Sequence, residues 1–217
     1  MVLATTFKVK QISSPTLRDL AYTHIKEFIL QGALKPGEKI FQDKMAEELG
    51  ISKIPLIQAL ALLEKEGILK KIPQKGFFVR KVSRDEILKI YDIRIIFEEI
   101  GIKKLIEDLN IKNVKKLNYY LSNFKKYFES SNKKNYILED LSFHHFLIEC
   151  GENEIIENFI DSLNVFIVVL IRGILDLDES YNDHVNIINA ILKKDSETSV
   201  RFLTGHLSKV KNKVLQK

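Results

Sequence analysis

The sequence predicts a mostly α-helical protein in which an N-terminal winged helix-turn-helix domain precedes an all-helical bundle. Three observations indicate this fold class. One helical pattern stops at Gly50, and another starts two residues later behind Ser52. A basic hairpin follows within residues 68–82, and from Ser83 onward every segment has helical periodicity.

The N-terminal domain is expected to span residues 1–82, with residues 1–16 as a loose arm. Apolar residues recur at helical spacing from Leu17 to Ile29, and Gly32 ends that helix. A short second helix is marked by Met45, Ala46 and Leu49. Two helices therefore precede the turn at Gly50.

The third helix has the signals of the second helix in a helix-turn-helix. Gly50 suits the left-handed end of the preceding helix, Ser52 can cap the next, and Pro55 lies in its first turn. The face expected to be buried carries Leu56, Ala59, Leu60 and Leu63. The opposite face, which in this motif enters a DNA major groove, carries Lys53, Ile54, Ile57, Gln58 and Ala61.

Two strands are predicted next, over Ile68–Ile72 and Phe77–Val82, and Gly76 supplies the backbone angles of the tight connection. The hairpin is strongly basic through Lys70, Lys71, Lys75, Arg80 and Lys81. The order of three helices and a basic hairpin is that of a winged helix, with the hairpin suited to a phosphate backbone.

The second domain, residues 83–217, is predicted to be helical throughout. Ser83 and Glu86 have the spacing of a capping box at its start. Helical patterns run over residues 85–109, 114–128, 136–150, 154–175, 181–193 and 197–215.

Positive charge is concentrated in the N-terminal domain. Residues 1–82 contain 14 Lys and Arg against 8 Asp and Glu, whereas residues 83–217 contain 20 against 21. A basic module joined to a neutral one is typical of a DNA-binding domain attached to a second function. The alternative is a lysine-rich surface that only keeps the protein solvated.

Composition narrows the class of protein further. Hydrophobic residues make up 45% of the chain, which is enough to build cores. The single cysteine, Cys150, excludes an internal disulfide framework, and the N-terminus lacks the apolar stretch of a signal peptide. The longest apolar run ends at Arg172 and is too short to cross a bilayer. We expect a cytoplasmic protein that does not partner with a membrane.

The N-terminal region resembles the GntR family of bacterial transcription regulators. The resemblance is carried by residues 29–40 (Ile-Leu-Gln-Gly-Ala-Leu-Lys-Pro-Gly-Glu-Lys-Ile), 52–60 (Ser-Lys-Ile-Pro-Leu-Ile-Gln-Ala-Leu) and 63–69 (Leu-Glu-Lys-Glu-Gly-Ile-Leu). The helical remainder is similar to the ligand-binding (FCD) domain of the FadR-type subgroup. The resemblance implies a homodimer that binds a palindromic double-stranded DNA operator.

The recognition segment departs from the family pattern at two positions. Where the family typically has Ser-Arg-Thr-Pro-Val-Arg-Glu-Ala-Leu, this chain has Lys53 and Ile57 in place of the two arginines. The lysine loses the bidentate fork, and the isoleucine offers an apolar contact to a thymine methyl. Expected DNA-binding residues are Ser52, Lys53, Ile57, Gln58, Lys75 and Gly76. The alternative is that this motif no longer binds DNA.

A metal site is expected in the helical domain. Asp140 and His144 are four residues apart, so on a helix they share a face and could share a metal. The resemblance implies two further histidine ligands at His184 and His206. Three imidazoles and a carboxylate suit zinc first, with nickel or manganese as alternatives. The competing interpretation is that each histidine is simply hydrogen-bonded in the core or on the surface.

Arg94 is the expected effector-binding residue. The segment from Tyr91 to Glu98 resembles the first helix of the FadR-type domain, where an arginine lies near the ligand cavity. Arg94 could therefore pair with a carboxylate effector. Equally, Arg94 and Glu98 at i,i+4 could form an ion pair on the helix surface or within the domain.

These features predict a transcription regulator whose operator affinity is controlled by a small organic acid bound at or near a divalent metal. A metal-sensing regulator without an organic effector is one alternative. A metal-dependent hydrolase is another, but the sequence shows no general base, nucleophile elbow or phosphate loop. We expect that the protein is not an enzyme. The operator, the effector and the direction of regulation are not indicated by the residues.

Overall fold

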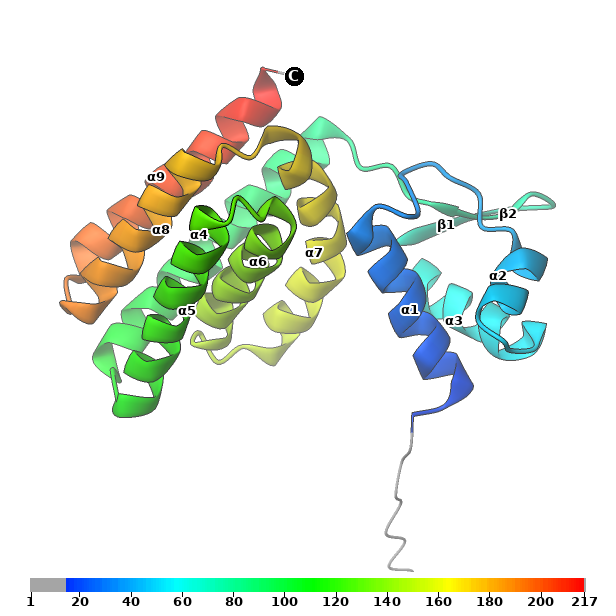
Figure 1. The fold of residues 1–217 in the computed structure, drawn as a ribbon, viewed down its shortest axis with the longest axis horizontal. Helices are drawn as coiled ribbons and strands as arrows, with labels where there is room; N and C mark the ends of the chain where they lie inside the picture. The colour runs from blue at the N-terminus through cyan, green and yellow to red at the C-terminus, as the bar shows by residue number, and fades with distance from the viewer. Residues whose placement is uncertain (1–14, 217) are drawn as a thin grey trace, which may run out of the picture. The chain divides into compact units, whose positions relative to one another are not determined.

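The computed structural model describes residues 15–216, apart from several side chains in one helix (Figure 1). Nearly all of the predicted N-terminal arm, residues 1–14, lies outside the described residues. The described chain forms two compact units, one ending at Val79 and the other starting at Arg80. This division falls three residues before the predicted domain boundary of 82/83.

The first unit has the winged-helix order, with α1 (Leu17–Gln31), α2 (Gln42–Glu48), α3 (Lys53–Lys65), β1 (Leu69–Ile72) and β2 (Gly76–Val79). Helix α1 starts at a capping box between Thr16 and Asp19, and Gly32 ends it at φ 78°. Helix α3 packs against α1, α2 and β1. The core of the unit includes Ile25, Ile29, Leu56, Ala59, Leu60, Leu63 and Ile68.

The two strands form an antiparallel hairpin whose register runs from Leu69 opposite Val79 to Ile72 opposite Gly76. The far edge of β2 pairs with the segment before α2: the amide of Val79 donates to the carbonyl of Glu38, and that of Ile40 donates to Phe77. The predicted second strand was too long, because no β1 residue remains to pair beyond Val79.

The second unit is a bundle of helices throughout its described part, as Figure 1 shows. Its elements are α4 (Arg84–Glu107), α5 (Ile111–Glu129), α6 (Lys133–Glu149), α7 (Glu154–Ile174), α8 (Leu177–Leu192) and α9 (Ser196–Leu215). The predicted capping box at Ser83 and Glu86 is present at the start of α4. Helix α4 packs on α6, α7 and α9, while α5 packs on α6 and α8. Over the described residues, none of the helices combines the length and apolar character of a membrane span.

A glycine allows α4 and α6 to approach each other closely. A Cβ added at Gly101 would lie 1.7 Å from the backbone oxygen of Leu147. Gly101 follows Glu98 by about one turn, and Leu147 follows His144 by the same interval. The close approach therefore brings polar residues of α4 beside those of α6.

Candidate DNA-binding surface and metal centre

The turn between α2 and α3 is closed by backbone hydrogen bonds. Gly50 has φ 64°, as the sequence predicted. Its amide donates to the carbonyl of Glu47, and the amide of Ile51 donates to Ala46 at 3.0 Å. This pair of bonds is a Schellman motif, which fixes the direction in which α3 leaves the turn.

Ser52 lies at the N-cap of α3, but its side chain makes no capping hydrogen bond, so the predicted side-chain cap is wrong. The reason is local. The usual partner is the amide of the second or third helical residue, and the third here is Pro55, which has no N–H. The exposed Ser52 hydroxyl is therefore not committed to the cap.

The two faces of α3 divide as predicted. Leu56, Ala59, Leu60 and Leu63 are fully buried. Lys53, Ile54, Ile57, Gln58 and Ala61 are exposed. Ile57 retains 42% of its surface, so it is not buried in the core of its unit. Lys53 forms an ion pair with Asp43 of α2, which the sequence did not indicate.

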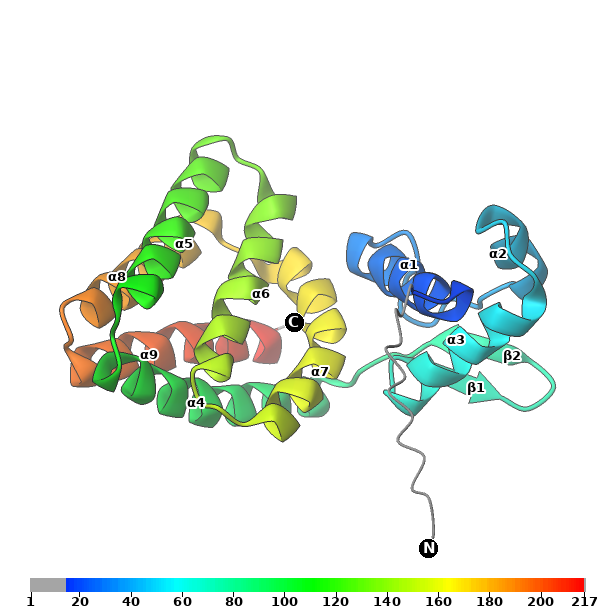
Figure 2. The ribbon, with the colours of Figure 1, turned by 90° about the horizontal axis from the view of Figure 1, so that it is seen from below.

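The hairpin presents its lysines beside α3. Lys70, Lys71 and Lys75 are exposed. Gly76 has φ 92°, which favours glycine, and Gln74 before it has φ 61°. Figure 2 shows α3 alongside the hairpin, and α3 contacts β1. The predicted DNA-binding residues thus share one unit and are solvent-accessible, with Gly76 partly so. Their contact with DNA stays a prediction.

The four predicted metal ligands meet in the interior of the second unit. Asp140 and His144 lie on α6, His184 on α8 and His206 on α9. All four side chains are buried, and one potential ligand atom from each lies within 4.8 Å of the others. The prediction that these residues come together is confirmed.

The arrangement of the donor atoms is better suited to binding a cation than to forming hydrogen bonds among the four side chains. Nε2 of His184 is 3.3 Å from Nε2 of His144 and 3.2 Å from Oδ1 of Asp140. The rings of His144 and His206 stack with their centroids 5.3 Å apart. One proton cannot satisfy several converging lone pairs, whereas a divalent ion can accept all of them. The residues present therefore fit a metal, and the cluster could bind one.

Each histidine has an outer partner at its other nitrogen. Nδ1 of His144 lies 2.5 Å from Glu98, and Nδ1 of His206 lies 3.3 Å from Asp183. The third contact joins Nδ1 of His184 to the Tyr136 hydroxyl at 2.9 Å, and that hydroxyl donates to Ser180. Such partners orient metal-binding imidazoles so that Nε2 faces the ion.

Burial controls the charges around the cluster. It lowers the pKa of His144 well below the ordinary value, helped by the positive charge of Arg94, and it also lowers the pKa of His206. Burial alone would raise the pKa of Asp140, but its contact with His184 and the neighbouring imidazoles bring the pKa below the ordinary value. Neutral imidazoles beside an ionised carboxylate are the protonation states that bind a metal.

Arg94 forms the ion pair with Glu98 that the sequence offered as one alternative, and its role in effector binding stays a prediction. Its Nε donates to Glu98 at 2.8 Å, with both side chains buried, so the pair is internal rather than on the helix surface. Burial raises the pKa of Glu98 to about 7, although Arg94 opposes that rise. One terminal nitrogen of Arg94 is buried without a hydrogen-bond partner, and Arg94 lines the cavity next to the cluster.

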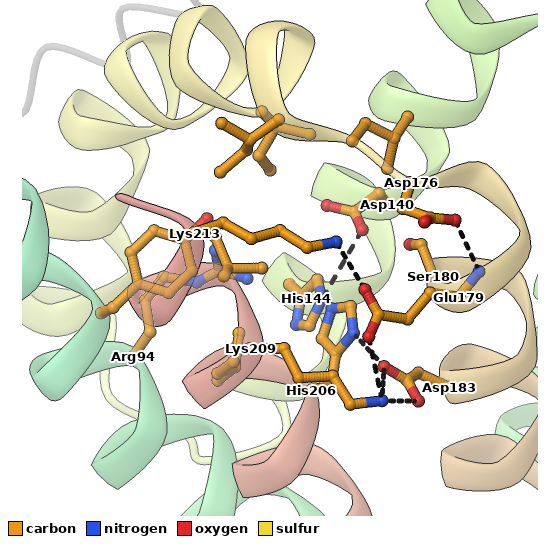
Figure 3. A pocket seen from close by; sticks show the side chains of 16 residues that line it. Arg94, Asp140, His144, Asp176, Glu179, Ser180, Asp183, His206, Lys209 and Lys213 are labelled. Carbon is orange, nitrogen blue, oxygen red and sulfur yellow. Dashed lines mark hydrogen bonds and ion pairs between the residues drawn. The ribbon is translucent and has the colours of Figure 1, made fainter. Parts of the chain in front are cut away.

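The centres of water-sized groups can occupy about 30 Å³ of that cavity, which is more than a single bound water needs. Figure 3 shows ion pairs between α8 and α9 beside it. Lys209 donates to Asp183 at 2.8 Å, and Lys213 pairs with Glu179. The cavity has room for an ion with a few water-sized groups, and all four of these ion-paired residues line it.

Sequence reasoning did not find the outer partners of the histidines. The contacts from Tyr136 to His184 and from Glu98 to His144 span 48 and 46 residues. Asp183 directly precedes His184 yet pairs with His206, because successive helical residues point in different directions. No local spacing rule connects such residues.

Comparison with known proteins supports both domains. Residues 17–79 match the model described as bacterial regulatory proteins, gntR family, and residues 89–209 match the FCD domain. The chain is 25% identical over 192 residues to the HTH-type transcriptional regulator YdhC of Bacillus subtilis, covering 86% of each protein. It is 25% identical over 197 residues to the gluconate operon transcriptional repressor of the same species, covering 86% of this chain and 80% of the repressor.

A solved structure has the same fold. Escherichia coli McbR/YncC superposes with a TM-score of 0.80 at 21% sequence identity, covering 93% of this chain and 98% of that one. The hydrolase alternative fails, because the matching domains and relatives are those of transcriptional regulators rather than enzymes. The chain belongs to the GntR family and, carrying an FCD domain behind its helix-turn-helix domain, is a DNA-binding transcriptional regulator.

Proposed function

We propose that this regulator binds one divalent metal per chain through Asp140, His144, His184 and His206. The observation that carries the proposal is the convergence of four buried ligand atoms within 4.8 Å, with each imidazole held from behind by an outer partner. Zinc is the first candidate because the donor set is rich in nitrogen, and nickel or manganese are alternatives.

We further propose that a small organic acid joins the metal and changes the affinity for the operator. The metal would supply positive charge for the carboxylate, and the unpartnered nitrogen of Arg94 would add a donor. One relative is named for the gluconate operon, and gluconate is such an acid. Because the ion-paired residues of α8 and α9 line the cavity, an acid bound there would compete for Lys209 and Lys213 and shift these helices, which gives a route from ligand to conformation.

The presence of four protein ligands, enough to complete a tetrahedral zinc site, also favours a second candidate, a metal sensor that needs no organic effector. In that case the metal alone would order α6, α8 and α9 around the four ligands. The two candidates differ in one respect: a carboxylate shifts operator affinity only in the first.

The DNA site is proposed to be a palindrome bound by a homodimer in the cytoplasm. Contacts are assigned to Ser52, Lys53, Ile57, Gln58, Lys75 and Gly76, which are accessible in the first unit. For the dimer contact, the exposed isoleucines Ile96 and Ile100, one turn apart on α4, offer an apolar surface.

The test combines metal analysis with operator binding. Purified protein is stripped with a chelator, reloaded with zinc, nickel or manganese, and titrated with operator DNA in the presence or absence of gluconate, citrate or lactate. A carboxylate effect that requires metal supports the proposal. A metal effect without any carboxylate effect supports the metal sensor. Unchanged affinity in every condition refutes both.

A further inference from the structure

The exposed face of the recognition helix is unusually apolar for a surface that meets DNA. Ile54 is 71% exposed and Ile57 is 42% exposed, one turn of α3 apart. Both lie opposite the fully buried face of the helix, so neither contributes to the core of its unit. Exposure alone does not identify what contacts them.

The charges around this face favour DNA as the occupant. Lys44, which pairs with Glu48, and Lys75 are exposed, and both line one surface depression together with Lys53, the first residue of α3. A protein partner that covered the isoleucines would have to face these lysines as well. A phosphate backbone beside a groove of bases satisfies both requirements, since the lysines meet phosphates and the apolar side chains meet base edges.

The same face lacks the residue that usually recognises guanine. No arginine occurs between residues 19 and 79, and arginine held bidentate to guanine is the commonest specific contact in the major groove. Lysine is the other guanine reader, and on the exposed face of α3 it is represented by Lys53 alone, which shares its charge with Asp43 in an exposed ion pair. Helix α3 therefore has few side chains that can form specific hydrogen bonds with G·C pairs.

Helix α3 does have side chains that can contact A·T pairs. Thymine carries the C5-methyl group in the major groove, which apolar side chains contact, and glutamine can bind adenine through N6 and N7. Gln58 is exposed next to Ile57. We propose that α3 reads A·T base pairs, with Ile54 and Ile57 on thymine methyl groups and Gln58 on adenine. This inference rests on the operator binding described above and specifies its chemistry.

The experiment uses the full-length protein. Bound sites are selected from random duplex DNA, and each thymine of the selected half-site is then replaced by uracil, which removes the methyl group and keeps the base pair. Burying one methyl contributes about 0.8 kcal/mol, so each contacted thymine should give a loss of roughly fourfold in affinity. Ile54→Ala and Ile57→Ala should each abolish the uracil effect at one position. Ile111→Ala removes an isoleucine that is 77% exposed in the second unit and should leave the effect intact.

The outcomes separate this inference from the function on which it rests. Salt-dependent binding to A·T-containing half-sites, with methyl sensitivity lost in the alanine variants, supports it. If the protein binds tightly but replacing thymine by uracil does not change its affinity, the inference is wrong, although DNA binding itself is supported. The same conclusion follows if the selected half-sites consist of G·C pairs. If the folded protein selects no DNA, both the inference about A·T pairs and the proposed operator binding are wrong. If the alanine variants change only the oligomeric state, measured by sedimentation, the isoleucines form a protein contact and the inference is wrong.

Discussion

Replacing Gly101 by alanine should disrupt the metal centre without touching a ligand. The new Cβ would lie 1.7 Å from the backbone oxygen of Leu147, whereas ordinary contact begins at 3.4 Å, so α4 and α6 must separate by about 1.7 Å. Overpacking typically lowers the free energy of unfolding by about 1–3 kcal/mol. Because the clash here is with backbone, which cannot rotate away, we expect a loss at or above the upper end of that range. The same separation would pull Glu98 away from His144, which it orients at 2.5 Å.

The assay is urea unfolding of metal-free and zinc-loaded protein, with zinc content measured in parallel. Gly205→Ala is the matched control, because this helical glycine on α9 has no atom within 4 Å of an added Cβ. Its substitution should be neutral or raise the free energy of unfolding by roughly 0.5–1 kcal/mol. A Gly101→Ala protein as stable as the Gly205→Ala protein would refute the close helix approach. A destabilised protein with normal zinc affinity would refute its link to the metal centre.

Three further predictions concern DNA and pH. Lys75→Ala should weaken binding to all sequences alike and reduce the slope of log affinity against log salt by about 1, measured by anisotropy; a sequence-selective loss would contradict a phosphate contact. Ile57→Arg should tighten binding by about 1–3 kcal/mol and shift preference towards guanine, with its melting temperature confirming the fold; unchanged affinity for every DNA would remove Ile57 from the interface. Metal affinity should persist below pH 6.5 and then fall, because burial lowers the pKa of His144 and His206 below that value. Through the same two histidines, the metal-free fold should lose stability below pH 6.5, where the unfolded chain takes up protons first. Zinc titrations across pH test the metal affinity, and urea unfolding of the metal-free protein tests the stability; as the pH is lowered, a loss of either that begins above pH 7 would contradict the corresponding expectation.

The sequence was most informative where a feature depends on neighbouring residues. Gly50 and the capping box at Ser83 were predicted from local spacing, and both are present. The expected cap at Ser52 was wrong, and Pro55 removes one of the two amides that such a cap can use. That consequence could have been derived from the sequence alone.

Rules based on residue spacing could not predict contacts between residues that are far apart in the sequence. Asp140 and His144 could be paired from their helical interval, but the positions of His184 and His206 came only from the family resemblance. The pairing of Lys53 with Asp43 and of Glu98 with His144 depends on how helices pack. The Arg94–Glu98 pair was one of two alternatives offered by the sequence, but its burial, and hence its place beside the cavity, depends on the packing of the bundle.

The most direct test of metal-controlled DNA binding compares the wild-type protein with a His144→Ala/His184→Ala variant. Zinc content and operator affinity are measured for both, before and after chelation, with melting curves to confirm folding. We predict about one zinc per chain in the wild type and none in the variant, and chelation should change the operator affinity of the wild type only. Full zinc stoichiometry in the folded variant, or wild-type operator affinity that chelation leaves unchanged, would contradict the account.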